Sequence, residues 1–182
     1  KLNEPMRRHT TFRIGGLAQA LLSVWNVDDL CSAVLWARRR EIPYYVVGQG
    51  SNILIADTGI KGLVIANRCQ GYQFVESEKG MTAFAEAGIS LSKLAYEVSE
   101  LGWSGLEWAV GIPGTLGGAI VGNAGAFGSD ISTSLTRVQV LDGQGHQRAY
   151  NVAELDFSYR FSRFKKEGGR SNRELIILAA EL

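Results

Sequence analysis

Residues 111–128 read GIPGTLGGAIVGNAGAFG and contain seven glycines in eighteen positions. Glycine loses more conformational freedom on folding than any other residue, so this density is unfavourable inside a regular helix or strand. The stretch contains no charged residue, cysteine or histidine. It therefore predicts a place where the backbone bends sharply, or where another group comes so close that a Cβ would be in the way.

Two explanations fit these glycines. In the first, successive backbone N–H groups converge into a concave nest for a phosphate, and a following helix N-terminus adds partial positive charge. Thr115 is suited to cap such a helix over LGGAIVG, so a diphosphate could sit against the N–H groups of residues 114–118. In the second, the glycines only allow backbone segments to pack tightly against each other.

A second glycine cluster, VVGQGSNIL, favours the phosphate explanation. It places Gly48, Gly50, Ser51 and Asn52 between two predicted strands, where backbone amides and short polar side chains can meet an anion. The cluster lacks the third glycine of the Rossmann fingerprint and the Gly-Lys-Ser/Thr of a P-loop. Two such loops predict a long ligand, such as a dinucleotide, held by a different fold.

The composition argues against several other classes of protein. Nineteen basic and eighteen acidic residues give a net charge of +1, without the broad positive surface of a nucleic-acid or anionic-membrane binder. Cys31 and Cys69 lack the spacing of a disulfide scaffold or zinc site, which fits a reducing cytoplasm. No apolar run is long enough for a membrane span, and the start has no signal core. We expect a soluble protein with a buried core.

Residues 1–68 are expected to form a first unit with the order β-α-β-β-β. A helix begins after Asn26, because Leu30, Val34 and Ala37 recur at helical spacing. The predicted strands of this unit are 18–25, 43–48, 52–55 and 62–66.

Residues 69–182 are expected to form a second, mixed unit. A helix begins at Ser90 and ends at Gly102, with a hairpin turning at Asp142-Gly143 further along the chain. A single capped helical turn is predicted over 151–157. The predicted strands are 72–76, 81–87, the two arms of 136–150, and 174–182, and the predicted buried face of the helix is Leu91, Leu94, Ala95, Val98 and Leu101.

The segment FSYRFSRFK at 157–165 places a cation among apolar residues. Arg160 follows Tyr159 and would point into a cleft, where its planar guanidinium can pair with a carboxylate or phosphate. The alternative is an ordinary arginine extending from a sheet edge into solvent. Both interpretations stay open at this point.

Taken together, these motifs resemble the UDP-N-acetylenolpyruvoylglucosamine reductase (MurB) family. The resemblance implies an α+β fold of two FAD-binding subdomains of the vanillyl-alcohol-oxidase (PCMH) type, 1–68 and 69–182. In that fold the two glycine loops would hold the FAD diphosphate. The matching blocks are NEPMRRHTTFRIGG at 3–16, VVGQGSNILIADTGIKGLVI at 46–65, GLEWAVGIPGTLGGAIVGNAGAFG at 105–128 and YRFSRFK at 159–165.

The resemblance also implies roles for individual residues. Arg160, beside Tyr159, matches the family's catalytic arginine and would stabilise the negative charge that develops during reduction. The implied cofactor-binding residues are Val47, Gly48, Gly50, Ser51 and Asn52 in the first unit and Gly111, Ile112, Pro113, Gly114, Thr115, Gly117, Gly118, Asn123, Ala124 and Gly125 in the second.

The implied reaction is FAD-dependent reduction of UDP-N-acetylglucosamine enolpyruvate to UDP-N-acetylmuramate with NADPH, in cytoplasmic peptidoglycan precursor synthesis. FAD is expected to bind non-covalently, because His9 and His146 lie outside the glycine loops. A UDP-sugar is the expected partner, with no metal, nucleic acid or membrane; the oligomeric state is left open.

The family would continue beyond Leu182 into a third, substrate-binding domain that carries a proton-donating serine and its glutamate partner. We assign neither role to Ser162 or Glu181. Two alternatives to the complete reaction therefore stay open. The chain could be a non-catalytic FAD-binding module or fragment of such an enzyme, or it could belong to another oxidoreductase of the same fold.

Overall fold

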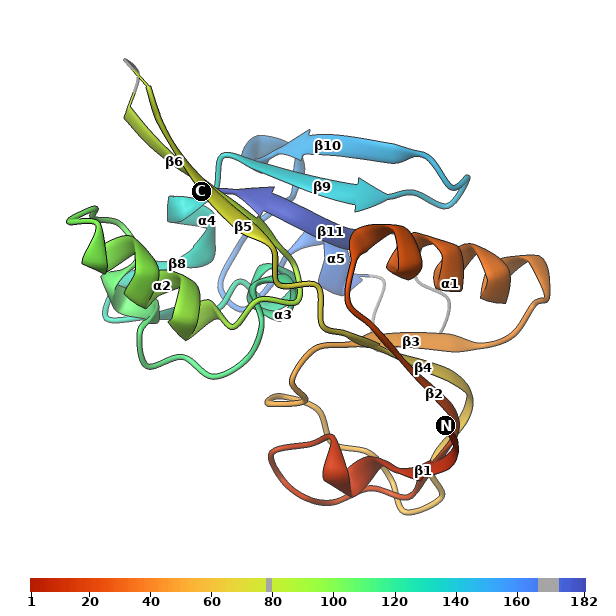
Figure 1. Cartoon of the computed structure of the whole chain (residues 1–182). Helices are drawn as coiled ribbons and strands as arrows, with labels where there is room; N and C mark the ends of the chain where they lie inside the picture. Colours follow the sequence, from red (N-terminus) through yellow and green to blue (C-terminus); the bar gives the residue numbers. More distant parts are fainter. Residues whose placement is uncertain (78–79, 167–173) are drawn as a thin grey trace.

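Helix α1 (Val27–Arg39) lies between the two main sheets of the protein (Figure 1). The structure, a computed structural model, describes residues 1–77, 80–166 and 174–182. One sheet has four strands and the other has five, and helices pack against both. This is the mixed α+β arrangement that the sequence predicted.

The first sheet has the strand order β1-β2-β4-β3. Strands β2 and β3 both run parallel to β4, whereas β1 is antiparallel to β2. The carboxyl ends of three parallel strands therefore meet at one edge of this sheet. The strands are β1 (Leu2–Pro5), β2 (Leu17–Val24), β3 (Tyr44–Val47) and β4 (Ile60–Asn67).

Helix α1 forms where its cap and apolar spacing predicted it. The Asn26 side chain accepts a 2.8 Å hydrogen bond from the backbone N–H of Asp29, which satisfies one of the free amides of the first turn. Leu30, Val34 and Ala37 are fully buried. They share a core with residues of both sheets, so one helix covers two surfaces.

The second sheet has the strand order β10-β9-β11-β6-β5, and all of its neighbouring strands are antiparallel. A bulge interrupts β11 between Ile177 and Ala179. Ile176 and Leu178 pack toward α1, whereas Ile177 faces the core of the second unit. The strands are β5 (Tyr72–Ser77), β6 (Gly80–Glu86), β9 (Arg137–Leu141), β10 (Gln147–Asn151) and β11 (Ile176–Glu181).

Short helices cover the other face of the second sheet. Ser90 caps α2 by accepting from the N–H of Lys93, and Thr115 caps α3 by accepting from the N–H of Gly118, as predicted. The helices are α2 (Leu91–Glu100), α3 (Leu116–Gly122), α4 (Ile131–Ser134) and α5 (Arg163–Lys166), with 3₁₀ turns at Met6–Arg8, Glu107–Ala109 and Val152–Glu154 and a small ladder of β7 (Gly125–Ala126) and β8 (Ser129–Asp130).

Three details of the sequence-based expectation are wrong. Residues 52–55 form no strand, because β4 is already paired on both sides and the chain instead turns Ile55 into a small core against the N-terminal segment. Leu101 is half exposed, since it follows the last turn of α2. The hairpin turn is not confined to Asp142-Gly143: five residues, 142–146, join β9 to β10, and Gly145 takes the left-handed conformation.

No helix in the described part of the chain has the length and apolar character that a membrane crossing would need.

The predicted division at residues 68 and 69 stays a prediction. Leu30 and Val34 of α1 belong to the same buried cluster as Leu141 and Leu178 of the second sheet. The two predicted units therefore share this cluster, and each depends on the other for burial of part of its apolar surface.

We expect Leu30→Ala to lower the free energy of unfolding by about 2–5 kcal/mol, because it leaves a cavity between the two sheets. Leu30 is 0% exposed, whereas Ser32 on the same helix is exposed. Urea unfolding of Leu30→Ala, with Ser32→Ala as the control, measures this effect. A loss no larger than that of the control would contradict the shared core.

Candidate functional site

The two glycine loops lie against each other although the two residues that bond across them, Ser51 and Pro113, are 62 positions apart in the chain. The first glycine loop, residues 48–52, follows β3, and the second glycine loop, residues 111–115, leads into α3. Ser51 Oγ donates a 3.3 Å hydrogen bond to the carbonyl oxygen of Pro113. The fold thus gathers the two sequence clusters into one place.

Missing side chains make this contact possible. A Cβ at Gly48 would lie 2.8 Å from Cγ2 of Thr115 and closer still to its Oγ1. A Cβ at Gly114 would lie 2.6 Å from Ser51 Oγ, and Gly114 also has a φ of +118°. A larger residue at Gly48 would displace the Thr115 side chain, and one at Gly114 would displace the Ser51 hydroxyl and be strained by its positive φ.

The N-terminal segment packs against the first glycine loop and bonds to it. The N–H of Thr11 donates to the carbonyl oxygen of Gly50 at 3.0 Å. Gly50 has a φ of +73°, and a Cβ there would overlap the carbonyl oxygen of His9. Glycine at this position is therefore a requirement of backbone packing as well as of conformation.

The second glycine loop is held by the connection between β6 and α2. The N–H of Leu91 donates to the Gly114 carbonyl at 3.0 Å, and the N–H of Leu116 donates to the Ile89 carbonyl at 3.0 Å. The N–H of Gly117 reaches the Ala87 carbonyl at 2.9 Å. For Gly117 the packing explanation holds, since a Cβ there would lie 3.0 Å from the Ala87 Cβ.

These bonds correct the prediction that the amides of residues 114–118 are all available to a diphosphate. The N–H groups of Leu116, Gly117 and Gly118 already donate within the protein, the last to Thr115 Oγ1 at 3.3 Å. Helix α3 has only seven residues, so its dipole is weak. The sequence could not reveal this, because two of the acceptors lie on the distant β6–α2 connection.

At least five amides remain free where the two loops meet. Within the part of the chain that the structure describes, the N–H groups of Gly50, Ser51, Asn52, Gly114 and Thr115 donate no hydrogen bond. They lie on the two loops that touch each other, next to the carboxyl ends of the parallel strands. This is where an open α/β sheet binds its ligand.

Two glycines of the site have no packing explanation. A Cβ at Gly111 would meet no described atom within 4 Å, and one at Gly118 would meet only Thr115 Oγ1 at 3.4 Å. Neither glycine has a positive φ. Their small size leaves room for a ligand to approach the backbone, which fits a long nucleotide cofactor.

Three further predicted residues, one before the first loop and two within the second, are apolar. Val47 ends β3 and is half-buried, and Ile112 packs at the edge of the second core with its N–H on the Ala109 carbonyl at 3.0 Å. Pro113 takes part in the contact through its carbonyl, which accepts the hydrogen bond from Ser51 Oγ. These three side chains form the apolar border of the site.

Asn123, by contrast, uses its side chain inside the protein. It ends α3 with a φ of +41°, and its Nδ2 donates to the Ser158 carbonyl at 3.0 Å and to Asp130 Oδ2 at 3.1 Å. Ala124 and Gly125 follow it, and a Cβ at Gly125 would lie 2.7 Å from the Asp130 Cβ. Asn123 thereby fixes the backbone beside the Tyr159-Arg160 pair.

Tyr159 and Arg160 form the tip of a two-residue turn. Ser158 and Phe161 exchange backbone hydrogen bonds of 3.1 and 3.0 Å on either side of them. Arg160 has a φ of +54°, a left-handed conformation that costs a non-glycine residue about 1–2 kcal/mol. Its Nη2 donates to the Gly125 carbonyl at 3.3 Å. The guanidinium is exposed and lies beside the glycine-rich segment, not in a closed cleft.

The sequence analysis missed Arg68. Its Nη1 donates a 2.7 Å hydrogen bond to the Gly48 carbonyl, directly at the first glycine loop. Arg68 follows β4, the strand parallel to β3. Its position could have been inferred from the parallel pairing, had the sequence revealed which strands are neighbours.

Other polar residues named from the sequence are engaged elsewhere. Ser162 is fully buried and donates to the Val121 carbonyl at 2.7 Å, and Glu181 lies 3.8 Å from Arg137. His9 lies 2.9 Å from Glu4, and this hydrogen bond lowers the pKa of the Glu4 carboxyl. Among the residues described here, no cluster of histidine, cysteine and carboxylate side chains has the geometry of a metal site.

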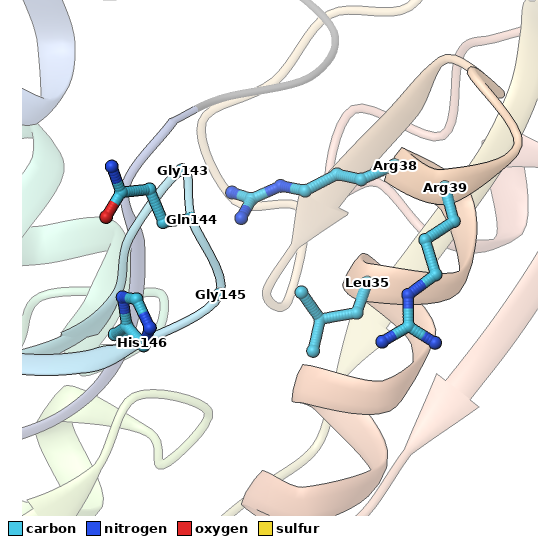
Figure 2. A pocket seen from close by; sticks show the side chains of 7 residues that line it. All are labelled: Leu35, Arg38, Arg39, Gly143, Gln144, Gly145 and His146. Atoms are coloured by element: carbon cyan, nitrogen blue, oxygen red, sulfur yellow. The ribbon is translucent and has the colours of Figure 1, made fainter.

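A hollow of about 430 Å³ lies between α1 and the β9–β10 loop, away from the glycine loops (Figure 2). It is located beside the start of β3, whereas the first glycine loop follows the end of that strand. Arg38 at its wall already donates to the carbonyls of Asp142 and Glu174 and to the Tyr44 hydroxyl. This hollow is therefore part of the seam where α1 meets the β9–β10 loop of the second sheet, and it does not belong to the candidate site.

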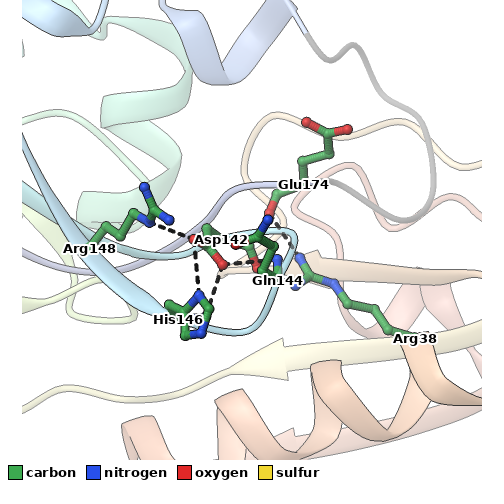
Figure 3. Close-up of polar contacts among 6 residues, drawn as sticks. All are labelled: Arg38, Asp142, Gln144, His146, Arg148 and Glu174. Atoms are coloured by element: carbon green, nitrogen blue, oxygen red, sulfur yellow. Dashed lines mark hydrogen bonds and ion pairs between the residues drawn. The ribbon is translucent and has the colours of Figure 1, made fainter.

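Asp142 organises the other side of that seam (Figure 3). Its carboxylate accepts 2.9 Å bonds from the N–H groups of Gln144 and His146 and lies 2.6 Å from Arg148 Nε. Chiefly the hydrogen bond from the His146 amide, and also that from Gln144, holds the pKa of Asp142 below its usual value. The ordered loop lets the Asp142 carbonyl meet Arg38 of α1.

Comparison with known proteins identifies the class of this site. A family model described as "FAD binding domain" matches residues 18–150. The chain is 40% identical over 179 residues to the UDP-N-acetylenolpyruvoylglucosamine reductase of Caldanaerobacter subterraneus, covering 98% of this chain and 56% of that protein. It is 45% identical to the enzyme of that name from a Synechococcus strain, covering 88% and 51%. The chain thus spans about half the length of these relatives.

Solved structures agree with these matches. The UDP-N-acetylenolpyruvylglucosamine reductase (MurB) of Thermus caldophilus superposes with a TM-score of 0.78 at 31% identity, over 97% of this chain and 59% of that one. Cholesterol oxidase from B. sterolicum gives a TM-score of 0.63 at 15% identity, over 89% and 33%, which shows the fold alone. The resemblance and the fold class inferred from the motifs are confirmed.

We expect Gly48→Ala to destabilise the protein by about 1–3 kcal/mol, because the new methyl group would overlap Thr115. Gly122→Ala in α3 is the control: a Cβ there would meet no described atom within 4 Å, so the change should be neutral or stabilising by up to about 1 kcal/mol. Thermal unfolding compares the two. Equal stabilities would show that the loops do not touch.

Asp142 should make stability depend on pH in a defined direction. Because its pKa is lowered in the folded state, the ionised carboxylate stabilises the fold at neutral pH, and this contribution disappears as the pH falls through that lowered value. Asp142→Asn should be less stable than the parent at pH 7, and the difference should shrink below about pH 4. Asp57→Asn controls for the loss of one exposed carboxylate. A difference that stayed constant with pH would contradict this.

Proposed function

The chain belongs to the FAD binding domain family, and we propose that it is the FAD-binding part of a UDP-N-acetylenolpyruvoylglucosamine reductase. The observation that carries this proposal is the contact between the two glycine loops, with five free amides beside it. The similarity to reductases of that name over nearly the whole chain supports the choice of enzyme.

In this proposal the backbone binds the cofactor. The free amides of Gly50, Ser51 and Asn52 in the first loop and of Gly114 and Thr115 in the second would hold the diphosphate. The open space at Gly111 and Gly118 would let the remainder of the cofactor approach the backbone. FAD, when bound, supplies the hydride chemistry, with NADPH as the proposed reductant.

Arg160 is the proposed catalytic residue. The substrate would be UDP-N-acetylglucosamine enolpyruvate, and the guanidinium would stabilise the negative charge that develops beside its carboxylate during reduction to UDP-N-acetylmuramate. Tyr159 lies with its ring centre 5.9 Å from the guanidinium carbon and helps to orient it. Asn123 fixes the turn through the Ser158 carbonyl.

A second function, binding of FAD without the reduction, is favoured by the positions of two side chains that a reductase could use as proton donors. Ser162 is buried on the Val121 carbonyl, and Glu181 lies at Arg137. Both side chains already have partners within the protein. The second candidate function is therefore that residues 1–182 bind FAD without completing the reduction. We further propose that the protein works in the cytoplasm, where its two cysteines, both buried as free thiols, would stay reduced.

Titration of the purified chain with FAD tests the proposal. We expect saturable binding, seen as a change in flavin fluorescence, and a yellow protein after gel filtration. Addition of NADPH and the enolpyruvyl sugar nucleotide then separates the two functions, because only the reductase oxidises NADPH in a substrate-dependent way. A colourless protein that cannot be reconstituted with FAD would reject both.

Arg160→Gly should separate catalysis from stability. Glycine adopts a φ of +54° without strain, so the variant should unfold at the same or a higher temperature. FAD binding should persist, while any reductase activity falls by about 10²-fold or more. Asp156→Gly is the matched control, since Asp156 is also exposed, with a φ of +49°. Equal activity of the two variants would exclude Arg160 from the chemistry.

A further inference from the structure

We propose that Arg68 is a cofactor-binding residue that pairs with the diphosphate held by the first glycine loop. This inference rests on the proposed function, because it requires that the loops bind a nucleotide diphosphate. Arg68 would supply the positive charge that the loops lack, because residues 48–52 and 111–115 contain no lysine or arginine.

The fold places Arg68 at the ligand-binding edge of the first sheet. It follows Asn67, the last residue of β4, and its N–H donates to the Val24 carbonyl of β2 at 2.8 Å. Strand β4 lies between β2 and β3, and all three are parallel. Arg68 therefore leaves the sheet at the same edge as Gly48.

The Arg68 guanidinium reaches the first glycine loop, and most of its N–H donors make no hydrogen bond to the described residues. Nη1 donates to the carbonyls of Gly48 at 2.7 Å and Asn67 at 3.4 Å. Nε and Nη2 donate to no residue in the described ranges. An arginine has five N–H donors in a planar fork, so three remain for a ligand in an arrangement that suits phosphate oxygens.

The charge of Arg68 is also uncompensated. No carboxylate among the described residues comes within 4 Å of its guanidinium to form an ion pair. The side chain is half-buried, which limits screening by solvent. A cation held in this way, one hydrogen bond from a loop with free amides, favours an anion at the same place.

If Arg68 only stabilised the first glycine loop, it would need fewer hydrogen-bond donors. The bond to the Gly48 carbonyl can tether the loop with a single N–H donor. That role would not make ligand affinity depend on the phosphates of the ligand or on salt. A direct ion pair would do both, because salt screens the attraction between the guanidinium and the diphosphate.

The test compares Arg68→Gln, which removes the charge, with Arg68→Lys, which keeps it but loses the fork. Arg39→Gln is the matched control, since Arg39 is exposed at the C-terminal end of α1, remote from the loops. Binding of FAD and of riboflavin, which lacks the diphosphate, is measured by flavin fluorescence at low and high ionic strength. Inorganic pyrophosphate serves as a competitor of FAD.

We expect Arg68→Gln to weaken FAD binding by about tenfold or more at low salt and to leave riboflavin binding unchanged. The parent, Arg39→Gln and Arg68→Lys should lose FAD affinity as salt rises, whereas Arg68→Gln should lose little. Pyrophosphate should compete less well against FAD on Arg68→Gln than on the parent.

Several results would overturn the inference while leaving FAD binding intact. These are equal FAD affinity of Arg68→Gln and the parent, a loss that is the same at both ionic strengths, or an equal loss for riboflavin. If Arg68→Gln does not fold, Arg68→Lys decides: affinity that no longer depends on salt would reject the ion pair. If the parent itself fails to bind FAD, the proposed function fails instead.

Discussion

The site depends on one contact, in which Gly48 at the end of β3 meets Thr115 at the start of α3. The first segment follows a strand of the first sheet and the second caps a helix that packs on the second sheet, and the missing Cβ atoms of Gly48 and Gly114 let them approach. The same contact places five free amides from two loops side by side. A single methyl group at Gly48 would overlap the Thr115 side chain and disturb the meeting point of the two loops. Glycine at position 48 is required because the two loops pack closely, and not because the backbone must be flexible there.

That contact is possible because α1 keeps the sheets together. Leu30 and Val34 are buried against both sheets, and Arg38 bridges the helix to the carbonyls of Asp142 and Glu174. Most of the stabilisation comes from apolar burial, whereas the polar bridges fix the relative position of the sheets.

The charges of the site stand outside the loops. Arg68 reaches the first loop from the edge of the sheet, and Arg160 lies beside Gly125 at the tip of a strained turn. Uncharged amides can surround a diphosphate closely, and in the proposed function each guanidinium would serve a different end of a long ligand. In this arrangement, binding of the cofactor and stabilisation of the reacting group can be changed separately.

The sequence by itself determined the helices, their caps, most strands and the family, because a cap at Asn26, Ser90 or Thr115 and an apolar period act within a few residues of chain. Only the tertiary structure decided that residues 52–55 form no strand, since that depended on whether a neighbouring strand was free to pair. It also decided that the amides of Leu116 and Gly117 are consumed by distant carbonyls. Arg68 was invisible for the same reason: its importance comes from which strands are neighbours, and hydrogen bonds between sheet strands leave no local trace in the sequence.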